Sequence, residues 1–185
     1  MSDDLQGRCD ELARMALAAC RRHGLFLAAS ESLTGGLLAD AFVRIPGASD
    51  VFLGSAVTYD IAAKASVLGV DQQLLDAHGA VHPQVAEQMA LGASKLYTQQ
   101  GHEGAVLGLS TTGVAGPGPD NGQPAGLVYV GMAVPARLVR SPQAGTLAGD
   151  YCLCSVQLQL QGSREAVRRS TVLQLLRRVF QLLNA

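Results

Sequence analysis

The chain has 185 residues, of which 48% are hydrophobic and 16% charged, and its formal net charge is −1. This length suits one domain with a sizeable core, and the composition excludes an intrinsically disordered chain. The near-neutral charge gives no general attraction to nucleic acid or to a membrane, so we expect neither as a partner and expect a small molecule instead. No apolar run approaches the roughly 18–20 residues that span a bilayer, and we expect a cytoplasmic protein.

In the first half of the chain, segments with helical spacing alternate with runs of strand-forming residues. Gly24 and Gly69 mark the ends of two predicted helices, and Pro83 suits the first position of another. The predicted elements are, in order, a helix over 5–23, a strand over 25–27, a turn leading into a helix over 34–44, a strand over 52–59, a helix over 60–68, a short helix and turn over 74–80, and a helix over 83–99.

The second half contains a strand over 105–109, a loop rich in Gly and Pro over 110–122, strands over 127–134 and 151–160, and a helix over 164–183. We expect the last two strands to pair antiparallel. Together these elements predict an α/β fold, a single domain over 1–185 that forms a three-layer α/β/α sandwich with a mixed sheet. Ligands of such sheets bind beyond the carboxyl ends of strands, where the turns at Ser32, Tyr59 and 111–118 would meet.

The turn between the first strand and the second helix is the first candidate site. It places Ser32 and Thr34 beside a helix N-terminus, where unpaired N–H groups favour an anion. A serine there suits a nucleophile, although Ser and Thr also cap many helices without any chemistry.

A serine nucleophile needs a base. All four histidines lie outside the junctions named above, so a Ser–Lys pair is the available arrangement. Only two of the 14 basic residues are lysines, Lys64 and Lys95. Lys64 stands among alanines and, if buried, would lose its proton more readily than an arginine, whereas an exposed helical lysine would have no such role. Tyr59 is a second candidate for relaying the proton.

Other residues suggest anion binding. The loop over 113–118 lacks the Gly-Lys-Ser/Thr of a P-loop, but its glycines can offer N–H groups. Arg164 and Arg168, four residues apart, can clamp a phosphate. The four cysteines have no Cys-x-x-Cys spacing, so neither a zinc site nor a disulfide framework is predicted.

Five segments together resemble the C-terminal domain of the competence/damage-inducible protein CinA, whose stand-alone members are nicotinamide-nucleotide amidohydrolases. The resemblance covers nearly the whole chain. The matching segments are Glu31-Ser32-Leu33-Thr34-Gly35-Gly36, Val57-Thr58-Tyr59 with Lys64, His78-Gly79-Ala80-Val81, Thr112-Gly113-Val114-Ala115-Gly116-Pro117 and Gly162-Ser163-Arg164-Glu165-Ala166-Val167-Arg168.

This resemblance implies hydrolysis of the carboxamide of nicotinamide mononucleotide to nicotinate mononucleotide and ammonia, with no metal and no cofactor. It implies Ser32 as the nucleophile, with Lys64 and Tyr59 as its activating partners. A small nucleotide is then the expected partner, and assembly into a homo-oligomer is left open. The residues expected to bind the substrate lie in the serine turn, the glycine-rich loop and the last helix: Glu31, Thr34, Gly35, Gly36, Thr112, Gly113, Ala115, Gly116, Gly118, Arg164 and Arg168.

Three positions depart from the family pattern. Leu33 stands where a cysteine is usual, Ile61 where an asparagine is usual, and His82 where a serine is common. Ile61 and His82 motivate an alternative, a nucleotide-binding or regulatory module of the same fold that has lost turnover. A third reading is an amidase that acts on another pyridine or nucleotide amide.

Overall fold

The computed structural model describes residues 2–139 and 145–184, so residues 1, 140–144 and 185 of the predicted domain lie outside it. One mixed sheet has the strand order β2-β1-β3-β4-β6-β5. Its strands are β1 (Phe26–Glu31), β2 (Phe52–Val57), β3 (Val106–Gly113), β4 (Leu127–Pro135), β5 (Thr146–Ala148) and β6 (Tyr151–Gln159). The helices are α1 (Ser2–His23), α2 (Leu37–Val43), α3 (Ile61–Leu68), α4 (Gln72–His78), α5 (Pro83–Tyr97) and α6 (Arg164–Leu183), with short 3-10 turns at Ala48–Asp50 and Ala136–Leu138.

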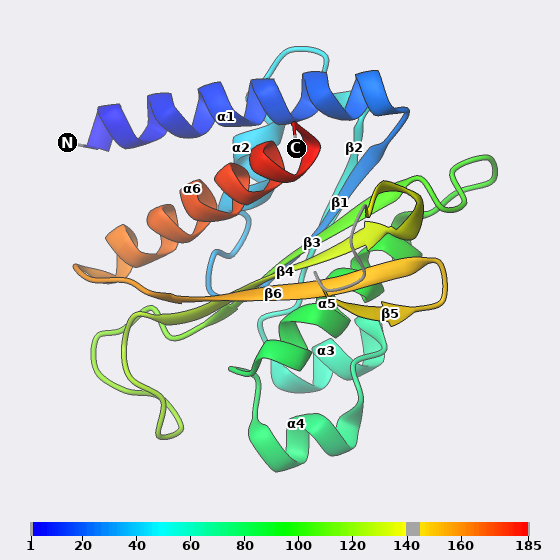
Figure 1. Ribbon diagram of the computed structural model, residues 1–185. Helices are drawn as coiled ribbons and strands as arrows, with labels where there is room; N and C mark the ends of the chain where they lie inside the picture. The colour runs from blue at the N-terminus through cyan, green and yellow to red at the C-terminus, as the bar shows by residue number, and fades with distance from the viewer. Residues whose placement is uncertain (1, 140–144, 185) are drawn as a thin grey trace.

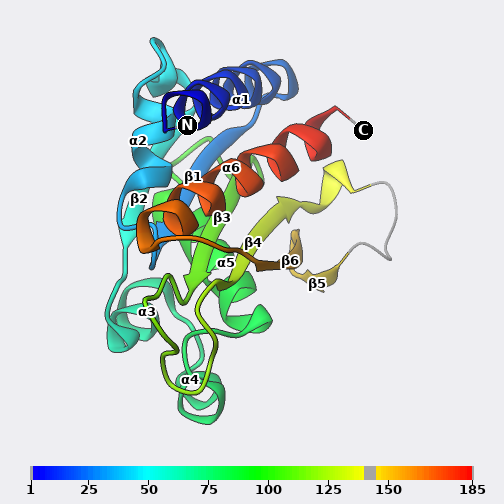
Figure 2. The ribbon, with the colours of Figure 1, turned by 90° about the vertical axis from the view of Figure 1, so that its left-hand side faces the viewer.

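Helices cover both faces of this sheet, which confirms the predicted three-layer α/β sandwich (Figure 1). Helices α1, α2 and α6 lie on one face, and α3, α4 and α5 lie on the other, as the perpendicular view also shows (Figure 2). Strands β1, β2 and β3 are parallel, whereas β4 is antiparallel to both β3 and β6. The predicted antiparallel pairing of the two late strands is therefore confirmed.

The larger hydrophobic cluster lies between the sheet and the helices α1, α2 and α6. Helix α6 supplies its inward face with Val172, Leu175, Leu176 and Val179, all with at most 3% exposure. This apolar stripe anchors the helix, and its first turn is thereby held at the end of the sheet where β1 and β3 finish. Among the helices of residues 2–139 and 145–184, none is long and apolar enough to cross a bilayer.

The first and third strands are longer than predicted, since β1 continues to Glu31 and β3 to Gly113. Most of the added residues are small or hydroxylated, a composition that predicts a loop. Helix α5 packs so closely on this sheet that a Cβ at Gly108 would lie 2.0 Å from the carbonyl oxygen of Ala90. The Ser110 hydroxyl donates to the Ala86 carbonyl at 2.6 Å. Close helix packing thus selects small residues where isolated strand propensity would prefer branched ones.

The second helix is shorter than predicted, because it begins at Leu37 rather than at Thr34. Gly35 and Gly36 have φ values of +55° and +98°. This left-handed region is incompatible with a right-handed helix and favours glycine. Thr34, Gly35 and Gly36 therefore form a tight turn that separates Ser32 from the helix.

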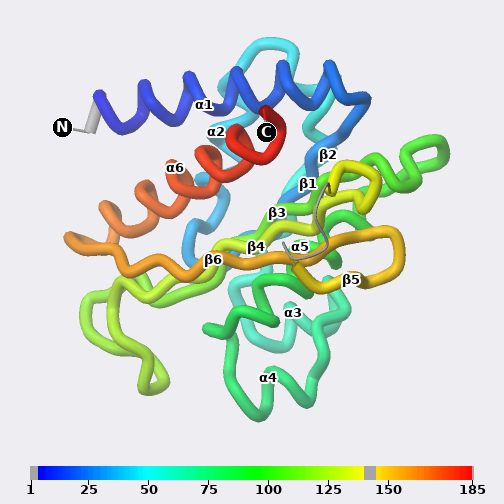
Figure 3. The backbone as a smooth tube through the Cα atoms, in the orientation of Figure 1, coloured from blue at the N-terminus to red at the C-terminus, as the bar shows by residue number. Residues whose placement is uncertain are grey.

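Most other boundaries agree with the predictions within a few residues. Helix α6 spans the predicted residues, and Pro83 is the first residue of α5, with His82 as its N-cap. Helix α1 begins three residues earlier than predicted. The short edge strand β5 was not predicted. The tube view shows how α3 and α4 follow β2 and lead into α5 on one face of the sheet (Figure 3).

Candidate active site

Ser32 and Lys64 meet at the carboxyl ends of the parallel strands. The Lys64 ammonium nitrogen Nζ lies 3.1 Å from Ser32 Oγ. Ser32 follows the last residue of β1, and its N–H donates to the Thr111 carbonyl of β3 at 2.9 Å, which fixes the serine backbone to the sheet. The two side chains are 8% and 0% exposed, respectively. The serine–lysine pair is therefore placed for proton transfer in a site largely shielded from water.

Lys64 reaches the serine from the first turn of α3. Asp60 caps this helix, because its carboxylate accepts the N–H groups of Ala62 and Ala63. Side chains of a helix lean toward its N-terminus, so Lys64 points back to the turn from which α3 starts. There its Nζ also donates to the Thr58 carbonyl at 2.7 Å.

Burial lowers the pKa of Lys64 from 10.5 to about 8, against a smaller opposite effect of the Asp60 carboxylate. The low-polarity surroundings disfavour the charged ammonium more than the neutral amine. A substantial fraction of Lys64 is therefore neutral at mildly alkaline pH. A neutral amine has the free electron pair that a base needs.

The same burial makes Lys64 a cost to folding at neutral pH. Unfolded chains hold the lysine proton up to pH 10.5, whereas the folded protein releases it near pH 8, so stability should rise with pH between these values. We expect Lys64→Met to raise the free energy of unfolding by about 1–3 kcal/mol at pH 7, since an apolar side chain of similar length replaces a buried charge. The gain should shrink at pH 9.5. Urea unfolding at the two pH values measures it.

Lys95 provides the matched control, because it is the only other lysine and lies exposed on α5. Lys95→Met should change the free energy of unfolding by less than about 0.5 kcal/mol at either pH. A Lys64→Met protein that is less stable than the unsubstituted one at pH 7 would show that the bonds of the ammonium outweigh its desolvation.

The turn that carries Ser32 is held by the carboxylate of Glu31, a side chain that is fully buried. The carboxylate accepts the N–H groups of Gly36, Leu38 and Ala39 at 2.9 to 3.0 Å. It also accepts the hydroxyls of Thr34 at 2.7 Å and Ser55 at 2.9 Å. Glu31 thus occupies the positive end of α2, and these helix N–H groups are not available to a substrate.

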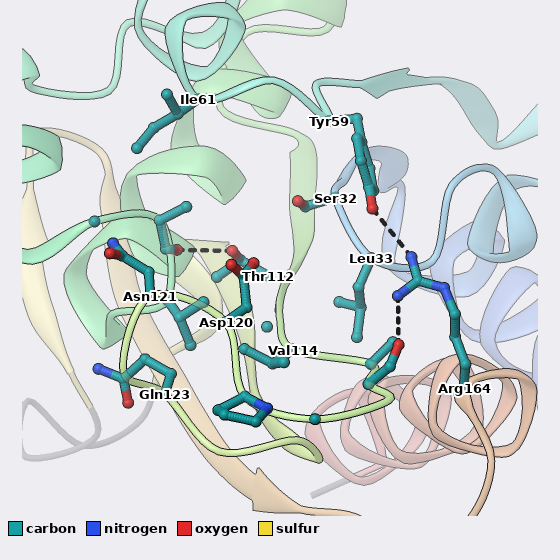
Figure 4. A pocket seen from close by; sticks show the side chains of 18 of the residues that line it. Ser32, Leu33, Tyr59, Ile61, Thr112, Val114, Asp120, Asn121, Gln123 and Arg164 are labelled. Carbon is teal, nitrogen blue, oxygen red and sulfur yellow. Dashed lines mark hydrogen bonds between the residues drawn. The ribbon is translucent and has the colours of Figure 1, made fainter.

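Tyr59 and Arg164 form one wall of the site. Arg164 donates from Nη2 to the Tyr59 hydroxyl at 3.0 Å and from Nη1 to the Gly116 carbonyl at 2.7 Å. Figure 4 shows Arg164 reaching from α6 to the tyrosine beside Ser32. Among the described residues, Lys64 is the only basic side chain bonded to the Ser32 hydroxyl. The Tyr59 hydroxyl is bonded to Arg164 instead, so a relay through this hydroxyl is not supported.

A cavity of about 730 Å³ opens above the serine. Tyr59, Ile61 and Arg164 line it together with the glycine-rich loop (Figure 4). The predicted loop residues all lie on its wall: Thr112, Gly113, Ala115, Gly116 and Gly118. Asp120, Asn121 and Gln123 line the side away from Arg164, as the close view shows. The cavity therefore has a guanidinium at one side and uncharged amides with a carboxylate at the other.

The remaining predicted substrate-binding residues do not line the cavity. Glu31, Thr34, Gly35 and Gly36 build the turn beneath Ser32. Arg168 was predicted to clamp a phosphate with Arg164, and the structure corrects this prediction. Its guanidinium donates to the carbonyl oxygens of Leu33 and Thr34 and to the carboxylate of Glu165, so it contacts the back of the turn.

Several residues of the site were not singled out from the sequence. The Thr58 carbonyl receives the Lys64 bond, and the Thr111 hydroxyl lies 2.7 Å from that of Thr34. Backbone carbonyls have no signal in a sequence, and a buried threonine resembles any other strand residue. The polar residues Asp120 and Asn121, in a loop of glycines and prolines, were the available signal for the far side of the cavity.

Fold and site together define a three-layer α/β protein with a buried serine–lysine pair at the carboxyl ends of its parallel strands. The chain belongs to the CinA C-terminal domain family, whose pattern it matches over residues 9–183. It is 39% identical over 165 residues to a competence-damage inducible protein of Caldanaerobacter subterraneus subsp. tengcongensis, which covers 89% of this chain and 35% of that protein. It is 44% identical over 141 residues to a CinA-like protein of Frankia casuarinae, covering 74% of this chain and 31% of that protein.

The chain thus spans about a third of the length of these curated relatives. Solved structures are similar over nearly their whole length. The competence/damage inducible protein CihA of Agrobacterium tumefaciens has a TM-score of 0.78 and 30% identity, with 95% of each chain covered. The competence damage-inducible protein A of Klebsiella pneumoniae subsp. pneumoniae has a TM-score of 0.79 and 25% identity, with 94% of this chain and 95% of that chain covered.

Proposed function

We propose that this protein is an amidohydrolase that converts nicotinamide mononucleotide to nicotinate mononucleotide and ammonia through an acyl-enzyme on Ser32. The observation that carries the proposal is the 3.1 Å contact between Ser32 Oγ and a buried lysine whose pKa is lowered to about 8. A serine with a partly neutral amine beside it is an activated nucleophile. The nicotinamide nucleotide is suggested by the family resemblance.

In the proposed first half-reaction, neutral Lys64 takes the hydroxyl proton as Ser32 Oγ attacks the carboxamide carbon. The bond from the carbon to the amide nitrogen then breaks, and this nitrogen receives a proton from the Lys64 ammonium and leaves as ammonia. An ester between Ser32 and the acyl group remains. In the second half-reaction Lys64 takes a proton from water, the hydroxide attacks the ester, and the proton returns to Ser32 as the carboxylic acid leaves.

The oxyanion of each intermediate needs hydrogen-bond donors. The N–H groups near Thr34 to Gly36 are the ones expected for this role, but those of Gly35 and Gly36 are bonded to the Ser32 carbonyl and to Glu31. Within residues 2–139 and 145–184, no group accepts a hydrogen bond from the N–H of Leu33 or Thr34. We assign the oxyanion donors to these two groups, which follow the nucleophile directly.

Arg164 supports a phosphorylated substrate. A guanidinium has five N–H donors, and this one uses two of its nitrogens for Tyr59 and Gly116. Arg164 lines a cavity of about 730 Å³, which is large enough for a mononucleotide. A phosphate is the group that a forked guanidinium binds best.

The proposal is tested by incubating the purified protein with nicotinamide mononucleotide at pH 8 and measuring ammonia together with the nucleotide product. We expect equal amounts of ammonia and nicotinate mononucleotide, and much slower release from free nicotinamide, which lacks the phosphate for Arg164. If the protein hydrolyses another amide from a small panel but not the mononucleotide, that other amide replaces nicotinamide mononucleotide as the proposed substrate. Calorimetric binding of the mononucleotide without ammonia at any pH from 6 to 9 would support the binding module favoured by Ile61, which lines the cavity.

A further inference from the structure

We propose that Arg168 is a positioning residue that aims the oxyanion donors of the Ser32 turn. This inference rests on the proposed amide hydrolysis. Arg168 Nε donates to the Leu33 carbonyl at 3.0 Å, and Nη2 donates to the Thr34 carbonyl at 2.8 Å. One guanidinium thus holds two successive peptide groups directly after the nucleophile.

The first of these bonds orients the N–H of Thr34. A trans peptide group is planar, and its C=O and N–H point in opposite directions. Because the Leu33 carbonyl points at the guanidinium, the N–H of Thr34 in the same peptide group points away from it. That N–H has no acceptor among the described residues. The N–H of Thr34 is therefore held in a fixed direction and is available to an oxyanion.

The second bond orients the N–H of Leu33 through one intermediate. The Thr34 carbonyl points at Arg168, so the Gly35 N–H of that peptide group points to the opposite side. There it donates to the Ser32 carbonyl at 3.1 Å. The Ser32 oxygen that accepts this bond points back toward Gly35. The N–H of Leu33, in the same peptide group as that oxygen, therefore points the opposite way, away from Arg168 like the N–H of Thr34, and it too has no acceptor among the described residues.

The guanidinium is itself well placed. Its Nη1 donates to Glu165 at 2.9 Å within α6, and its Nη2 lies 3.5 Å from the position that a Cβ of Gly35 would take. Gly35 has φ +55°, so glycine leaves room for both the left-handed turn and the arginine. The fork geometry of a guanidinium spans the two carbonyls, which a single ammonium would not.

Arg168→Met tests the role, because methionine keeps much of the length and removes every donor. With nicotinamide mononucleotide we expect kcat to fall about 10- to 100-fold while KM changes less than about threefold, since loss of one oxyanion donor typically costs 10²–10³ in kcat and here both donors are only misaligned. Binding of the product nucleotide, measured by calorimetry, should stay the same. A merely structural role would weaken product binding and turnover together.

Arg169→Met is the matched control. Arg169 also bonds to Glu165, at 2.6 Å, but its other partner is Gln6 of α1. This variant should keep kcat within about twofold. If Arg168→Met fails to fold, Arg168→Lys replaces it, and we expect the same direction of change because one ammonium cannot hold both carbonyls.

The rate at which a small fluorophosphonate labels Ser32, followed by mass spectrometry, separates this inference from the proposed substrate. The reagent builds negative charge on a phosphoryl oxygen and needs the same donors, but no amide. We expect Arg168→Met to be labelled at least tenfold more slowly than Arg169→Met. If the unsubstituted protein is labelled but releases no ammonia, nicotinamide mononucleotide is rejected as the substrate and the role of Arg168 is unaffected. Equal labelling rates of the two variants, or no labelling of the unsubstituted protein, would overturn the role of Arg168.

Discussion

Lys64→Arg is expected to lower kcat for amide hydrolysis by about 10³-fold or more, although it keeps the positive charge and the approximate length of the side chain. General-base catalysis contributes about 10²–10⁴ in rate, and arginine does not give up its proton near neutral pH. The wider guanidinium must also fit where the lysine Nζ lies 2.7 Å from the Thr58 carbonyl and 3.1 Å from Ser32 Oγ. Ammonia release under saturating substrate measures the loss.

The pH dependence of the unsubstituted protein assigns the base. In the proposed mechanism the neutral form of Lys64 is the active one, and it predominates only above its pKa of about 8. We therefore expect kcat/KM to rise with pH from 6 and to level off above a midpoint near 8. The Lys95→Arg protein should show the same profile and rate, because Lys95 is exposed. Lys64→Arg with most of its activity, together with an inactive Tyr59→Phe, would instead make the tyrosine the proton acceptor.

Ser32→Ala should abolish acyl transfer, with a fall in kcat of about 10⁴-fold or more. Removing the hydroxyl eliminates the covalent route, and the residual rate reports only what Lys64 and the oxyanion donors do for direct attack by water. The fold should be unaffected, because the Ser32 side chain has Lys64 as its bonded partner and the backbone bond to Thr111 remains.

Mass spectrometry provides the second readout for this variant. During turnover the unsubstituted protein should carry the acyl group on the peptide that contains Ser32, and Ser32→Ala should carry none. Calorimetry should give both proteins the same affinity for the product nucleotide. A Ser32→Ala protein that hydrolyses the amide at the unsubstituted rate would contradict the nucleophile assignment and point to a lysine-activated water.

The pairing of Ser32 with Lys64 was predictable because Ser32 stands at one strand-to-helix junction and Lys64 about one turn after the next, at Tyr59, and such junctions meet at one edge of a parallel sheet. The extents of β1 and β3 were not predictable from local propensity, since small residues such as Ser30 and Ser110 stand in these strands where α5 packs closely on them. The placement of Arg168 was not predictable either. Its position four residues after Arg164 suggests a shared ligand, whereas its partners are backbone carbonyls that no side-chain pattern reveals.

The contact between Arg168 and the serine turn also sets an order for biosynthesis. Arg168 and Thr34 are 134 residues apart along the chain. Proteins are made from the N-terminus, so a ribosome adds Ser32 and Lys64 to the chain long before it reaches α6. Until that helix emerges and docks on α1, the carbonyls of the turn have no guanidinium to hold them. In a nascent chain the proposed nucleophile is therefore present before the arginine that we propose positions its turn, and translation of α6 supplies that arginine.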